Sequence, residues 1–122
     1  MMHKKENTED GPYREHFKNG AISVEGQYKD HQKTGLWKYY LLNGKLKATG
    51  KFKHGKMHGE WTWYRKNGEL MQTGSFDMDI RSGIWTRYRE NGKKLDEGEY
   101  QGEKKTGEWK TYDEQGHLKT SK

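Results

Sequence analysis

The string GEWTWYRKNG, Gly59 to Gly68, is written almost unchanged at three other places in this chain of 122 residues. The other copies are GLWKYYLLNG at 35–44, GIWTRYRENG at 83–92 and GEWKTYDEQG at 107–116. Successive copies begin 24 residues apart. A fixed period of roughly 20 to 50 residues is typical of repeat proteins, whose units pack on their neighbours.

The unit extends beyond the quoted string. It reads G-x-W-x-x-Y-x-x-N-G, then about five residues, G-x-[FY] and a polar link of six residues. One step upstream the pattern persists in degraded form, with Tyr13 at the tryptophan position and Asn19-Gly20 in place. We therefore predict one domain of tandem units after a flexible N-terminal tail at 1–10. The five predicted units are 11–34, 35–58, 59–82, 83–106 and 107–122.

The composition agrees with a thin, repeated core. Only 28% of the residues are apolar and 34% are charged, which leaves little surface to bury against the entropy cost of folding. The 13% of aromatic residues and the 16 glycines nevertheless indicate a folded chain. No cysteine is present, which excludes disulfides and thiol chemistry.

The charge pattern and the start of the chain bear on partners and location. The formal net charge of +6 suggests an anionic partner, but the two signs are interleaved and no basic run marks a nucleic-acid arm. The first ten residues, MMHKKENTED, contain no apolar run of a signal peptide. We expect a cytoplasmic protein, although a chain from which a targeting segment had been removed would begin in the same way.

The Asn-Gly pairs predict β-hairpins with two-residue type I′ turns, which need positive φ at both central residues. Counting outward from the turn gives the register, unless a three-residue turn with a bulge shifts it. A tryptophan then faces a glycine and covers its bare backbone. The predicted cross-strand pairs are Leu42–Lys45, Leu41–Leu46, Tyr39–Ala48, Trp37–Gly50, Trp61–Gly74, Trp85–Gly98 and Arg87–Asp96.

Because side chains alternate along a strand, the repeated tryptophan and the tyrosine three residues later should lie on opposite faces. The spacing of helical apolar residues fails in every unit, and the glycines are too dense for helices. The predicted fold is all-β, an elongated single-layer antiparallel sheet of tandem β-hairpins with no helices of note. Successive units should lie about 10 Å apart.

The segment FKHGKMHGEW, 52–61, resembles the MORN repeat, whose core reads roughly Y-x-G-x-W-x-x-G-x-x-H-G. The longer unit is similar to the bacterial MORN variant of the YwqK-type antitoxins, and the resemblance covers about Gly11 to Leu118. It implies a non-enzymatic hairpin array. In the bacterial variant the implied role is to neutralise a cognate toxin, and in eukaryotic MORN proteins it is scaffolding, dimerisation or lipid contact. The link departs from the pattern at DIRSG (79–83) and EKKTG (103–107).

Positions that recur in every unit are interpreted as packing, so binding residues are sought where the units differ. One such column, two residues after the tryptophan, changes chemistry at each step: Glu15, Tyr39, Trp63, Arg87, Thr111. Tyrosine, tryptophan and arginine dominate binding hot spots. A second departure is Leu41-Leu42, which with Leu36 would form an exposed apolar patch. The predicted partner-binding residues are Tyr39, Leu41, Leu42, Trp63 and Arg87. The other interpretation of the leucines is a local core, with Leu41 packed on Leu46.

The other candidate sites in the sequence are supported by weaker patterns. The link DMDIRS, 77–82, is either a contact loop or a drifted repeat. His54 and His58 are four residues apart but have no Cys or acidic companion, so we predict no metal and no cofactor. No nucleophile elbow, P-loop or dinucleotide fingerprint is present, so we predict that the protein is not an enzyme.

The sequence thus favours a protein-binding module. Its most specific form is the antitoxin or immunity partner that sterically neutralises a bacterial toxin, with basic residues steering an acidic surface. The alternatives are peripheral binding to anionic lipid and a scaffold or assembly role. Nucleic-acid binding by stacking on the aromatic residues ranks below these.

Overall fold

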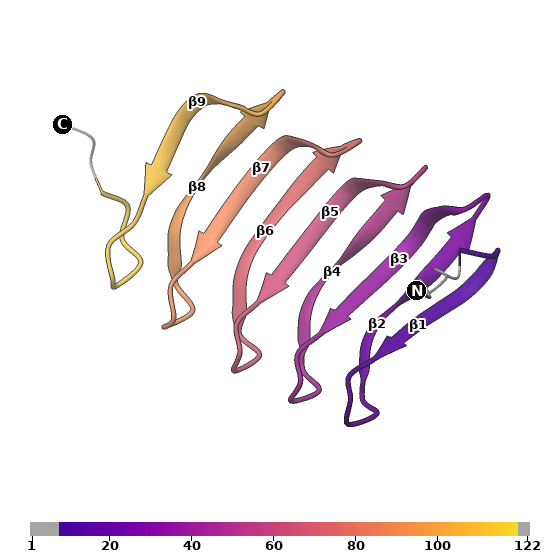
Figure 1. Cartoon of the computed structure of the whole chain (residues 1–122). Coiled ribbons are helices and arrows are strands. Elements are labelled where there is room, and N and C mark those ends of the chain that lie inside the picture. The colour runs from indigo at the N-terminus through magenta and orange to yellow at the C-terminus, as the bar shows by residue number, and fades with distance from the viewer. Residues whose placement is uncertain (1–7, 120–122) are drawn as a thin grey trace, which may run out of the picture.

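The repeated strings form one open antiparallel sheet (Figure 1). The computed structural model describes residues 8–119, and within that range it contains nine strands and no helix, so the predicted all-β class is confirmed. The strands are β1 (Gly11–His16), β2 (Ile22–Lys29), β3 (Gln32–Tyr40), β4 (Leu46–Lys53), β5 (Lys56–Tyr64), β6 (Leu70–Asp77), β7 (Ile80–Tyr88), β8 (Lys94–Gln101) and β9 (Lys104–Thr111).

The strands lie side by side in chain order, from β1 at one edge to β9 at the other. Of the predicted tail at 1–10, residues 1–7 lie outside the described residues. The rest contacts the first link, where Asp10 Oδ1 accepts a hydrogen bond from the backbone N–H of Asp30 at 2.7 Å. The described part of the chain has no helix with the length and apolarity needed to cross a membrane.

The Asn-Gly turns have three residues, so the predicted type I′ turn is wrong there. The N–H of Leu41 donates to the carbonyl of Lys45, the N–H of Gly44 donates to that of Leu41, and of the turn residues Gly44 alone has positive φ, 88°. The predicted pairs Leu42–Lys45 and Leu41–Leu46 therefore do not form. An extra residue in β4 then shifts the register back, because Tyr40 pairs with Leu46.

From that point outward the predicted register is confirmed. The two irregularities, a three-residue turn and a one-residue bulge, cancel one another. The observed pairs that match the prediction are Tyr39–Ala48, Trp37–Gly50, Trp61–Gly74, Trp85–Gly98 and Arg87–Asp96.

The links between units are the true two-residue hairpins. At Met78-Asp79, for example, φ is 52° and 73°, and the flanking residues Asp77 and Ile80 are paired. Positive φ at both central residues is the conformation of a type I′ turn. The predicted six-residue polar link is therefore two strand ends joined by a tight turn. The same conformation recurs at Asp30-His31, His54-Gly55 and Gly102-Glu103.

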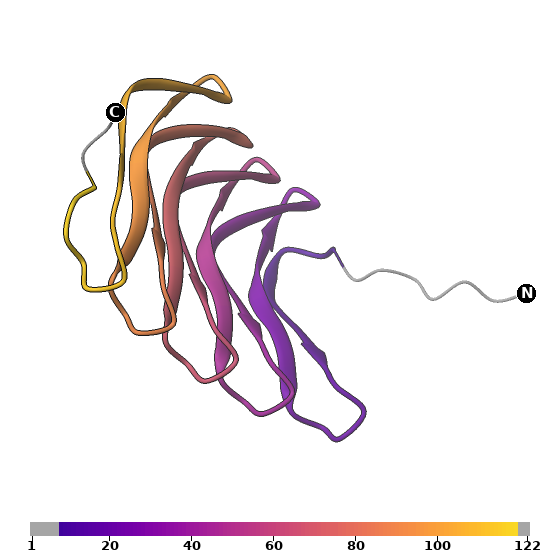
Figure 2. The same cartoon turned by 90° about the vertical axis from the view of Figure 1, so that its left-hand side faces the viewer.

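The strand register shifts a second time where each unit pairs with the unit before it. Gly50 pairs with Trp61, but the next residue, Lys51, pairs with His58, so two residues of β5 are passed over near Gly59. Gly59 has φ of 83°, which favours glycine. Bulges bend the strand that carries them, and Figure 2 shows that the strands bend and that the sheet is curved.

The core consists of tryptophans stacked on glycines of the preceding unit. Trp37, Trp61 and Trp85 are 0%, 2% and 7% exposed. A Cβ atom on Gly50 would lie 2.1 Å from the Trp61 ring, so only glycine fits beneath the indole. The Trp61 indole N–H also donates to the Lys51 carbonyl at 3.0 Å, beside the bulge.

This packing corrects one expectation. Trp61 is in register with Gly74 of its own hairpin, as predicted, but the glycine that its indole covers is Gly50 of the unit before. The relation recurs for Trp85 over Gly74 and for Trp109 over Gly98. The tryptophans therefore join units rather than the two strands of one hairpin.

The two faces of the sheet differ in chemistry. The aromatic face carries the repeated tryptophans together with Phe52 and Phe76. The polar face carries the repeated tyrosines, as the alternation predicted. There the Tyr40 hydroxyl donates to Glu25 at 2.6 Å, which raises the pKa of Tyr40 to about 12 and lowers the pKa of Glu25.

Candidate protein-binding face

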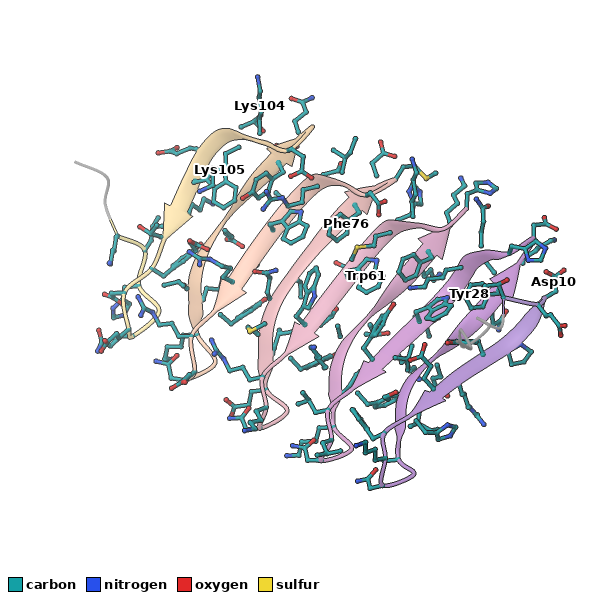
Figure 3. All side chains as sticks on the ribbon, in the orientation of Figure 1. Asp10, Tyr28, Trp61, Phe76, Lys104 and Lys105 are labelled. Atoms are coloured by element: carbon teal, nitrogen blue, oxygen red, sulfur yellow. The ribbon has the colours of Figure 1, made fainter. Side chains whose placement is uncertain are left out.

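The aromatic face is a continuous ladder of rings that crosses the sheet. Figure 3 shows Tyr28, Trp61 and Phe76 along it. The ring centroid of Phe76 lies 6.5 Å from that of Trp61 and 5.1 Å from that of Trp85, both edge-on. Tyr100 lies in the same way 5.9 Å from Trp85 and 5.2 Å from Trp109. Edge-on pairs are favourable because the positive rim of one ring meets the negative face of the other.

Two of the predicted binding residues fill a second line of rings on this face. Tyr39 lies 6.3 Å from both Trp37 and Trp61, and Trp63 lies 6.2 Å from Trp61 and 5.5 Å from Trp85. Both side chains are half-buried. Burial raises the pKa of the Tyr39 hydroxyl. Each ring is thus held by its neighbours while part of it remains open to a partner.

Arg87 occupies the same column on β7, so the structure places Tyr39, Trp63 and Arg87 on one face. Its guanidinium forms two hydrogen bonds to Asp96, at 3.0 Å from Nε and 2.6 Å from Nη2. The hydrogen bond to Asp96 raises the pKa of Arg87. The Arg87 side chain remains 56% exposed, whereas that of Asp96 is 15% exposed.

The two leucines lie elsewhere, at the Asn-Gly turn that joins β3 to β4. Leu42 is 62% exposed and Leu41 is half-buried. Leu36 is 49% exposed, but it pairs with Lys51 in the middle of β3 and lies on the polar face. The predicted apolar patch of these three leucines is therefore wrong, because the turn and the middle of the strand are several residues apart.

The position of Leu41 has a role in other units that was not predicted from the sequence. Arg65 Nη2 donates to the Tyr88 carbonyl of the next unit at 2.7 Å, and Arg89 Nη2 donates to the Tyr112 carbonyl at 2.9 Å. The Nε atoms of both arginines are buried. This position joins neighbouring units, and a leucine cannot donate the bond. The recurrence of arginine at 65 and 89 was the available signal.

A row of cations over the rings was also missed. The Lys33 ammonium lies 4.9 Å from the Trp37 ring, and the Lys105 ammonium lies 4.6 Å from the Trp109 ring. The Arg81 guanidinium lies 4.4 Å from the Tyr100 ring. The three residues occupy equivalent positions of their units, separated by multiples of 24 residues, which the sequence could have shown. They give the aromatic face a basic border, suited to an acidic partner.

The link at 77–82 is hydrogen-bonded to the unit before it, and His58 takes part in these bonds. Asp79 exchanges two bonds with Met57 of the preceding unit: its N–H donates to the Met57 carbonyl, and its carboxylate accepts from the Met57 N–H at 2.7 Å. His54 lies in a link turn, and His58 Nδ1 accepts from the N–H of Met78 at 3.2 Å. Residues 8–119 contain no group of three or more His, Cys, Asp or Glu residues that could hold a metal ion.

An open sheet of tandem hairpins with one ring-covered face is the architecture of a repeat-type binding or scaffold module. The family model described as MORN repeat variant matches the chain in five successive segments, at 9–30, 33–54, 57–78, 81–101 and 105–121. The chain belongs to the MORN repeat variant family. The search of curated proteins found no match.

Proposed function

We propose that the protein binds another protein through its aromatic face and has no enzymatic activity of its own. The observation that carries this proposal is the pair of half-buried rings, Tyr39 and Trp63, each fixed between two tryptophans. Rings held in place lose little conformational entropy on binding, and tyrosine and tryptophan supply much of the affinity in hot spots.

Within this proposal, the partner is a bacterial toxin and the protein acts in the cytoplasm as its antitoxin. The resemblance of the unit to the YwqK-type antitoxins supports the role, and the basic border of Lys33, Arg81 and Lys105 supports an acidic contact surface on the toxin. Inhibition would be steric, with the sheet covering the active site of the toxin.

The first test is capture of partners from a native lysate on the immobilised protein at about 0.15 M and about 1 M salt, with identification by mass spectrometry. A single protein retained at both salt concentrations, in stoichiometric amount, is the expected result. Its purified form then allows Kd to be measured against variants. Retention of only lipid or nucleic acid, lost at high salt, would contradict the proposal and favour a salt-screened surface.

The variants separate binding from folding. Tyr39→Ala and Trp63→Ala should each weaken the complex about tenfold or more while the variants remain folded. Trp61→Ala should impair both folding and binding, because its indole is 2% exposed and joins two units. Leu42→Ala tests the turn, which lies away from the aromatic face. Equal behaviour of all four variants would contradict the assignment of the contact to Tyr39 and Trp63.

A further inference from the structure

The second line of rings on the aromatic face contains Tyr39 and Trp63 but has no ring at the equivalent position of the next unit. Tyr39 fills the space between Trp37 and Trp61, and Trp63 fills the space between Trp61 and Trp85. The next space, between Trp85 and Trp109, has Arg87 where a ring would stand. The Arg87 guanidinium is held by two hydrogen bonds to Asp96.

The space left by the absent ring is a hollow of about 340 Å³. Its walls include Trp85, Tyr100 and Trp109, and its border includes Arg87 and Lys105. Trp85 is buried beneath it, whereas Trp109 is half-buried. Like the surroundings of Trp63, the walls of the hollow include aromatic rings of two neighbouring units.

The charges around the hollow are mainly positive. Arg81, Arg87 and Lys105 line it, with Asp96 as the one carboxylate among its lining residues. Arg87 is paired with Asp96, and Arg81 with Glu103 at 2.8 Å. Among residues 8–119, Lys105 forms no salt bridge, and its ammonium is held over the Trp109 ring. It is thus the cation free to meet an incoming carboxylate.

We infer that this hollow receives an aromatic side chain of the protein partner, flanked in the partner sequence by an acidic residue. The ring completes the ladder between Trp85 and Trp109, and the carboxylate pairs with Lys105. The inference rests on the proposed function and adds to it the chemistry of the segment that is recognised. An aliphatic side chain would lose the ring stacking, and a neutral neighbour would leave Lys105 without its ion pair.

The test uses the full chain and three blocked peptides: acetyl-Asp-Phe-Asp-amide, acetyl-Asp-Leu-Asp-amide and acetyl-Asn-Phe-Asn-amide. Nuclear magnetic resonance follows the indole N–H signals during titration. We expect the first peptide to bind with Kd on the order of 1 mM and to shift the signals of Trp85 and Trp109 but not that of Trp37. The other two peptides should bind about threefold to tenfold more weakly.

Two variants make the test specific. Arg87→Trp places in the hollow the residue that fills the preceding space, and should abolish the shifts. Lys105→Gln changes an exposed side chain and should weaken the acidic peptide about threefold, while leaving the neutral peptide unchanged. Lys33→Gln is the matched control, since it removes the equivalent cation over Trp37, away from the hollow.

Three results would overturn the inference: shifts spread evenly over all the tryptophans, equal binding of the three peptides, or unchanged binding to Arg87→Trp. Failure here is distinct from failure of the proposed function. If Tyr39→Ala and Trp63→Ala weaken the partner complex but the peptides avoid the hollow, only the inference is wrong. If the peptides fill the hollow but the lysate yields only lipid or nucleic acid, the proposed function is wrong.

Discussion

Trp61 and Trp63 stand two residues apart on the same strand and face, yet their surroundings differ. Trp61 is 2% exposed, lies over a glycine of the preceding unit and donates a hydrogen bond to Lys51. Trp63 is half-buried and packs against the rings of Trp61, Phe76 and Trp85. Tryptophans of the first kind recur in four of the five units, whereas the residue at the second position changes from unit to unit. Side chains of one type thus divide into those that join units and those that are available for contact.

The largest expected effect tests this difference directly. Trp61→Ala should lower the free energy of unfolding by about 4 kcal/mol, because it leaves a cavity and removes the bond to Lys51. Trp63→Ala should lower it by about 1 to 2 kcal/mol, since part of the ring is already in water. Urea unfolding followed by circular dichroism measures both. Equal losses would show that the two indoles are energetically alike and would break the comparison.

The second effect comes from the glycine beneath Trp61. Gly50→Ala should cost about 3 kcal/mol, because the new methyl group would lie 2.1 Å from the indole. Gly44→Ala is the matched control. It has nothing within 4 Å and a φ of +88°, so it should cost about 1 to 2 kcal/mol from backbone strain alone. Thermal unfolding of the two variants ranks them, and a costlier Gly44→Ala would contradict the role of the stacked indole.

A third comparison moves from the indoles to the arginines that also join units. Arg65→Leu reproduces the residue of the unit before and should cost about 1.5 kcal/mol, because the Tyr88 carbonyl loses a charged donor. Leu41→Arg should introduce a similar hydrogen bond to a carbonyl of the next unit and so raise the free energy of unfolding. Lys66→Leu, on the exposed neighbouring side chain, is expected to change it by less than about 0.5 kcal/mol.

The smallest effect extends the comparison to the two faces through Tyr39 and Tyr40. Both pKa values are raised, that of Tyr39 by burial and that of Tyr40, to about 12, by its bond to Glu25. A raised tyrosine pKa stabilises the fold below the unfolded value of about 10, and this contribution is lost as pH rises toward the folded value.

The test is a titration of tyrosinate absorbance in Glu25→Gln and the unchanged chain. Glu25→Gln should lower the pKa of Tyr40 and leave that of Tyr39 unchanged, with Tyr40→Phe used to assign the signal. A change confined to Tyr39 would mean that the two faces are coupled through the sheet.

The sequence allowed the period, the all-β class and most strand pairs to be predicted. These features depend on side-chain alternation and glycine spacing, which involve residues close together in the chain. The turns could not be assigned correctly. Asn43-Gly44 has the composition of a type I′ turn but adopts a three-residue turn, whereas Met78-Asp79 adopts the I′ conformation without that composition. In these links, bonds such as the pair between Asp79 and Met57 hold residues at positive φ.

The candidate site was predicted in part. Counting by two placed Tyr39, Trp63 and Arg87 on one face, which needs only the pleat of the strand. Which glycine each indole covers, and which carbonyl Arg65 reaches, depends on how neighbouring units dock. The sequence of one unit does not contain that information. The predicted patch of Leu41, Leu42 and Leu36 was wrong for a related reason. The distance of the first two from Leu36 depends on where the strand ends.

The stacking of each indole on the preceding unit has a consequence for the growth of the molecule. Every joint between full units uses the same pair, so an added block of 24 residues would bring both an indole for the joint behind it and a glycine for the joint ahead. Gene duplication can therefore lengthen the binding surface by about 10 Å per copy without redesign of any joint. The number of units therefore sets how large a surface of a partner the protein can cover.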